Sequence, residues 1–211
     1  MANKRMDRRL VLFSASAFAL AGCGGLGLGP TDTNNTIYLL EPAIAASGGQ
    51  PATWALAVDL PEATDALDSR RIALIKPDAT LDYYANAVWA DRLPVLVQTA
   101  LVAAFQAGGH VPSVTRIDDA LHADYELGTE IRDCAAHYSA PDGVPLVTVS
   151  LVAQMSTAHG RKIIASFTAK QDASAGQNST TAVVAAFNAA LSAAIGQIVT
   201  WALSLPAPPG P

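Results

Sequence analysis

A long segment without charge near the end of the chain restricts the fold more than any other feature of the sequence. Residues 182–205 contain no Asp, Glu, Lys or Arg, and a helix over them is about 36 Å long at 1.5 Å per residue. Such a helix must be covered by other parts of the protein or lie in a membrane. Its narrow polar stripe (Asn188, Ser192, Thr200 and Ser204) and its many alanines favour a helix buried on nearly all sides. A membrane span is the alternative.

The rest of the chain alternates between strand patterns and one further helix pattern. Apolar residues at three- and four-residue spacing predict a helix over 94–107, with Asp91 near its start and Gly108–Gly109 at its end. Ser179 or Thr180 is expected to cap the final helix. Strand patterns cover residues 37–40, 54–60, 71–75, 81–84, 111–117, 125–138, 146–155 and 163–170. The elements predict a single α/β domain over residues 37–205, in which two principal helices pack on a mixed β-sheet and the last three strands form a meander.

The first 23 residues have the pattern of a secretory signal. Four basic residues precede an apolar run over 10–20, which is too short to span a bilayer. The sequence Leu20-Ala21-Gly22-Cys23 resembles the bacterial lipobox, which implies cleavage after residue 22 and acylation of Cys23. The alternative is an ordinary signal peptide with a chance cysteine. Because Gly24 rather than Asp follows Cys23, we expect the protein to face the periplasm from the outer membrane.

The mature chain is acidic and flanked by segments without a hydrophobic period. The whole sequence has 13 basic and 18 acidic residues, and removal of residues 1–22 leaves 9 against 17. This balance argues against nucleic acid and against electrostatic binding to anionic lipid. Residues 23–36 are predicted to be a flexible tether, and the proline-rich residues 206–211 a disordered tail. Cys134, the only other cysteine, is expected in the core.

The sequence shows no catalytic or metal-binding motif. His110, His122, His137 and His159 are isolated from one another, and no Gly-x-Ser-x-Gly elbow is present. The adjacent carboxylates Asp118–Asp119 are interpreted as solvated surface. We therefore expect no enzyme, no metal and no cofactor apart from the covalent lipid on Cys23.

Several motifs, in their order along the chain, carry a family resemblance. They are the lipobox, Ile37-Tyr38-Leu39-Leu40-Glu41-Pro42, Arg71-Ile72-Ala73, the stretch from Leu81-Asp82-Tyr83-Tyr84 through Val88-Trp89-Ala90 to Leu93-Pro94, Ala123-Asp124-Tyr125-Glu126-Leu127, and a final helix ending in Trp201. This arrangement resembles the auxiliary lipoproteins of ABC-type transport systems, of the paraquat-inducible protein C type. The resemblance covers nearly all of the mature chain.

The resemblance implies a non-enzymatic partner of a transporter that moves lipids or other hydrophobic molecules between the two membranes. Its partners would be an MCE-domain protein with an ABC permease and an ATPase. Within the family's aromatic segment, Tyr83, Tyr84 and Trp89 could offer contact area to a partner. Alternatively, these rings cover the sheet edge and brace the start of the first helix. Trp54 and Trp201 are expected in the core.

Other functions stay open at this point. An outer-membrane assembly or structural lipoprotein unrelated to a transporter is the main alternative. A direct carrier of hydrophobic cargo predicts a deep apolar cavity, and an envelope enzyme predicts a buried polar cleft. Because both predicted helices lack charge, a homo-oligomer that covers them is a further hypothesis.

Overall fold

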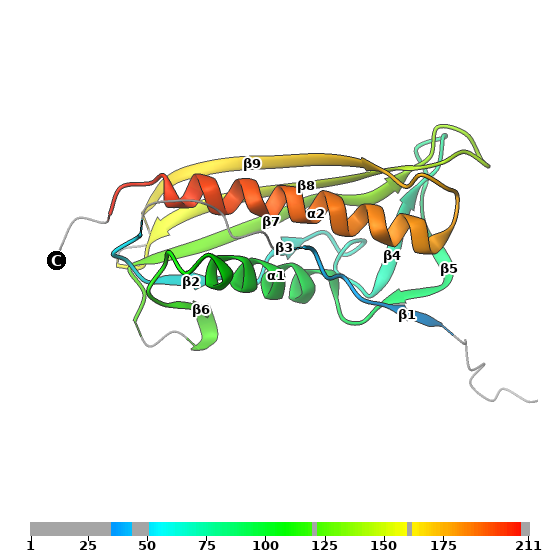
Figure 1. Cartoon of the computed structure of the whole chain (residues 1–211). Helices are drawn as coiled ribbons and strands as arrows, with labels where there is room; N and C mark the ends of the chain where they lie inside the picture. Colours follow the sequence, from blue (N-terminus) through cyan, green and yellow to red (C-terminus); the bar gives the residue numbers. More distant parts are fainter. Residues whose placement is uncertain (1–34, 44–50, 120–121, 160–161, 208–211) are drawn as a thin grey trace, which may run out of the picture. The chain divides into compact units, whose positions relative to one another are not determined.

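The computed structural model describes residues 35–43, 51–119, 122–159 and 162–207 of the 211-residue chain. The predicted signal peptide, Cys23, nearly all of the tether and the last four residues of the tail lie outside this part. The predicted fold class is confirmed: a mixed sheet with two helices forms the described domain (Figure 1).

Nine strands form the sheet, and two α-helices and one 3₁₀ helix complete the domain. In chain order the elements are β1 (Thr36–Tyr38), β2 (Leu56–Val58), β3 (Glu62–Ala63), β4 (Arg71–Ile75), β5 (Leu81–Trp89), α1 (Leu93–Gly108), β6 (Val114–Arg116), η1 (Ile117–Asp119), β7 (Tyr125–His137), β8 (Leu146–Thr157), β9 (Ile163–Ser174) and α2 (Thr180–Leu203).

The long strand β7 organises the sheet. Along one edge it pairs in parallel with β2, then β3, then β4, and along the other edge it pairs antiparallel with β8. Strand β9 pairs antiparallel with β8, which completes the predicted meander. Strand β5 joins β4 antiparallel and β1 in parallel, and β6 joins β2. One long strand thus supports three short parallel strands in succession.

The local sequence explains the starts of both helices and the end of α1. The hydroxyl of Ser179 accepts a hydrogen bond from the backbone N–H of Ala182, so Ser179 caps α2. Helix α1 has no side-chain cap at Arg92, and Pro94 lies in its first turn, where a missing N–H costs nothing. Gly109 ends α1 in the left-handed conformation, with φ of 61°.

Helix α2 packs on β8 and β9 with one face, which agrees with a core helix. The prediction of burial on nearly all sides is only partly met, because the helix has an exposed stripe formed by Ala185, Ala189, Ala193 and Gln197. It is long and apolar enough to cross a bilayer by length and composition, but more than half of its most apolar window is buried inside the domain. The Phe187 ring meets Trp89 edge-on at 5.4 Å, and Trp201 stacks on Phe167 at 5.6 Å. Trp54 is buried against Tyr125, whereas Trp201 is only partly buried.

Candidate functional site

The aromatic segment predicted as a contact site lies in β5, where its three rings have different environments. Tyr83 is partly buried: its hydroxyl donates a hydrogen bond to the Ala66 carbonyl at 3.0 Å. The Arg71 guanidinium lies 3.4 Å from the centre of the Tyr83 ring, a cation–π contact. Both interactions fix the ring on the adjoining elements.

Tyr84 is held by a chain of hydrogen bonds. Its hydroxyl lies 2.8 Å from that of Tyr138, which donates to Asn178 Oδ1 at 2.9 Å. Burial, and then the contact with Tyr138, raise the pKa of Tyr84, so the hydroxyl stays protonated. The chain links β5 to the turn before α2.

Trp89 lies in the core and offers no ring surface to a partner. It is 1% exposed, and its ring meets Phe187 of α2 edge-on. Its carbonyl accepts a hydrogen bond from Arg70 Nε at 3.1 Å. These contacts favour the bracing interpretation for Trp89. Tyr83 and Tyr84 are the members of the predicted set that retain exposed area.

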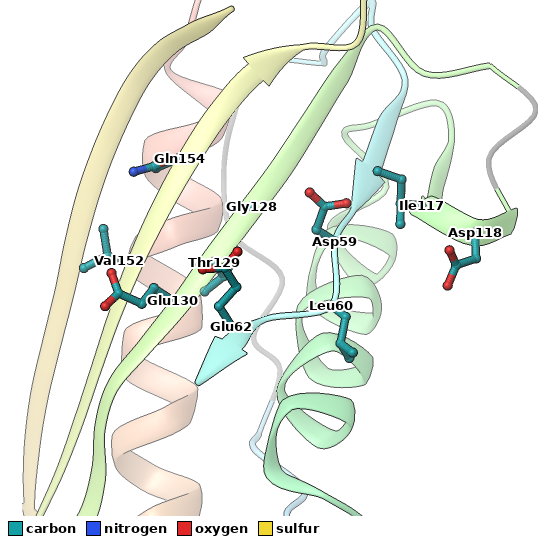
Figure 2. A pocket seen from close by; sticks show the side chains of 10 residues that line it. All are labelled: Asp59, Leu60, Glu62, Ile117, Asp118, Gly128, Thr129, Glu130, Val152 and Gln154. Atoms are coloured by element: carbon teal, nitrogen blue, oxygen red, sulfur yellow. The ribbon is translucent and has the colours of Figure 1, made fainter. Parts of the chain in front are cut away.

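A hollow of about 400 Å³ on the sheet is surrounded by carboxylates (Figure 2). Asp59 follows β2, Glu62 begins β3, Asp118 lies in η1 and Glu130 belongs to β7. The hollow lies where β7 ends its pairing with β2 and begins its pairing with β3. Gly128 lies at this point, and a Cβ there would be 3.9 Å from Asp59 Oδ2.

The lining of this hollow favours cations over anions through its negative charge. Its residues include no His, Cys, Lys or Arg. Glu130 forms an ion pair with Arg132 at 3.2 Å. In the part of the chain that the structure describes, no group of three His, Cys, Asp or Glu side chains is arranged to hold a metal ion. Asp118 and Asp119 are both exposed, which agrees with solvated surface.

The four histidines come from separate segments, and His137 lies beside a carboxylate. Its Nε2 lies 2.9 Å from Asp133 Oδ2 on the same strand. Burial raises the pKa of Asp133, and the nearby His137 partly offsets this effect. Cys134 is fully buried, which raises the pKa of its thiol and keeps it protonated. The core position predicted for Cys134 is thus confirmed.

Comparison with known proteins identifies the domain. The model of the ABC-type transport auxiliary lipoprotein component family matches residues 38–199. The crystal structure of a Xanthomonas campestris protein assigned to the DUF330 family model is similar, with a TM-score of 0.74 and 28% identity; the alignment covers 80% of this chain and 94% of that one. A second solved structure, with a TM-score of 0.60 and 15% identity over 79% of this chain and 97% of the other, shares the fold.

A protein of Bradyrhizobium diazoefficiens is 30% identical over 166 residues, which are 79% of this chain and 44% of the relative. The chain therefore spans less than half the length of that relative. The match of the family model runs from β1 into α2, and so includes nearly the whole described domain. On this ground the chain belongs to the ABC-type transport auxiliary lipoprotein component family.

Proposed function

We propose that this protein is a non-enzymatic lipoprotein, anchored by Cys23 to the outer membrane and facing the periplasm. There it acts as the auxiliary component of an ABC transport system with an MCE-domain protein, a permease and an ATPase. The system moves lipids or other hydrophobic molecules between the inner and outer membranes. Membership of the auxiliary lipoprotein family is the observation that carries this proposal.

The packing of the domain supports docking rather than cargo carrying. A carrier needs a deep apolar cavity, whereas here one continuous cluster of buried side chains fills the space between sheet and helices. The carboxylate-lined hollow is polar, which does not suit an acyl chain, and the apolar hollow beside Phe167 and Trp201 is open to solvent rather than deep. Tyr83 and Tyr84, held in place by hydrogen bonds, are the proposed contact residues for the transporter.

The experiment is a crosslinked capture of the full-length lipoprotein from whole envelopes, with mass spectrometry of proteins and lipids. The proposal expects an MCE-domain protein with its permease and ATPase. Recovery of outer-membrane proteins alone would favour the assembly or structural lipoprotein. Recovery of lipid without a transporter would favour the carrier.

The anchor is tested separately with Cys23→Ala. Because the acidic domain lacks affinity for anionic lipid, this variant should leave the outer-membrane fraction, either released or held as uncleaved precursor. Cys134→Ala is the matched control, since it removes the buried thiol and should fractionate normally. Normal outer-membrane fractionation of Cys23→Ala would refute the anchoring argument.

A further inference from the structure

Strand β9 forms a long open edge of the sheet. Among the described residues it pairs with β8 alone, and Figure 1 shows no strand beyond it. Over its 12 residues, the backbone groups that point away from β8 have no strand to pair with. Sheets usually protect such an edge with proline, several charges or a covering element. Strand β9 contains no proline and two charged residues.

Those two charges are opposite in sign and two residues apart, at Lys170 and Asp172. Both side chains are exposed, and the strand alternation directs them to the same face. Asp172 accepts a hydrogen bond from the Thr148 hydroxyl at 2.6 Å, which orients its carboxylate. Within the described residues, Lys170 forms no ion pair. If two β9 strands align antiparallel about Gln171, Lys170 of each copy lies opposite Asp172 of the other.

We propose that two copies of this chain associate through their β9 edges, antiparallel and centred on Gln171. The charge pattern makes the edge complementary to itself, because this register forms two opposite-charge pairs related by the twofold axis. The neighbouring pairs are small: Ala169 faces Ala173, and Thr168 faces Ser174.

Helix α2 leaves open space at the Phe167 end of the β9 edge. Beside β9, Phe167 and the helix residues Ala193, Gly196 and Trp201 border an open hollow of about 620 Å³. No heavy atom lies within 4 Å of a Cβ built on Gly196. Around Phe167 the helix therefore leaves open space beside the strand.

Disulfide formation in whole envelopes tests the register with the full-length lipoprotein. Gln171→Cys places two thiols on the axis, where paired strands hold Cα atoms about 4.5–5.5 Å apart, within the range of a disulfide. Ser166→Cys is the matched control on the same strand. In the proposed register the two copies of residue 166 are about 33 Å apart, at 3.3 Å per residue. Gln171→Cys should give at least about tenfold more crosslinked dimer than the control.

Charge substitutions in the Gln171→Cys background test the pairing itself. Lys170→Asp alone places carboxylates opposite each other, and Asp172→Lys alone places ammonium groups opposite each other; each should lose most of the dimer. Differently tagged copies carrying one change each have complementary edges, so their coexpression should restore the crosslink between them.

Three results would overturn the proposal. They are equal crosslinking of Ser166→Cys, crosslinking of Gln171→Cys only to a different protein, and failure of the coexpressed charge variants to recover the dimer. Thermal unfolding of each variant shows whether it is folded. If a charge variant is unfolded, the comparison of the two cysteine variants decides.

Discussion

Replacing Trp89 with alanine should destabilise the domain strongly, because the ring connects β5 with α2. The side chain is 1% exposed and lies edge-on against Phe187. A buried Trp side chain removes about 150–250 Å² from water, worth about 4–6 kcal/mol at 25 cal/mol per Å². Measured losses for Phe or Trp to Ala in cores are about 3–5 kcal/mol, which agrees. The loss would be a large share of the roughly 5–15 kcal/mol that stabilises a typical protein.

The measurement is urea unfolding of the purified full-length protein, followed by circular dichroism. Tyr83→Phe is the control on the same strand: it removes the hydrogen bond to the Ala66 carbonyl and should cost about 0.5–1.5 kcal/mol. A loss below about 1 kcal/mol for Trp89→Ala, together with lost capture of the transporter, would refute the core assignment and support a contact role.

Two further predictions concern the cap of α2 and the acidic group on β7. Ser179→Ala removes the hydrogen bond from the Ala182 N–H to the Ser179 hydroxyl. Because this bond is long, at 3.4 Å, we expect the free energy of unfolding to fall by about 0.5–1 kcal/mol, near the lower end of the usual range for a cap. An unchanged melting temperature would contradict the capping role. Burial raises the folded-state pKa of Asp133 above its ordinary value of 3.8. The difference between the folded and unfolded pKa values therefore gives the folded domain stability that is fully present below pH 3.8. This stability is lost as the pH rises through the raised pKa. Asp133→Asn should therefore flatten the decline in stability that sets in as the pH rises above 3.8, and an unchanged profile in urea unfolding would argue against it.

Periodic patterns predicted the helices and the meander because each of these elements buries a regular face. The alternation from Tyr125 to His137 and the apolar face of α2 depend only on neighbours along the chain. Short strands were less predictable. We expected one strand over residues 54–60, but the structure has a shorter strand, β2, at Leu56–Val58. A second short strand, β3, begins directly after Pro61. Pairing with β7, which is distant in sequence, decides their limits.

At the candidate site, too, the sequence predicted what depends on local pattern and missed what depends on pairing between distant segments. The extension of β5 to Trp89 was not predicted, because its second half is a strand through pairing with β1. Asn86 has a positive φ of 54°, which interrupts the regular alternation before Trp89 turns into the core. The carboxylates around the hollow come from three separate parts of the chain. Only the folded sheet brings them together, and no local pattern marks them.

The central place of β7 also determines the order in which the domain can fold. Strands β2, β3 and β4 must each wait for a strand that begins at Tyr125, so more than half of the chain is made before they can complete their ladders. Before that point, β4 and β5 can form a hairpin that β1 joins. Contacts between segments so distant in sequence slow folding. Apart from this three-stranded piece, the N-terminal half should therefore gain little sheet structure until β7 is available.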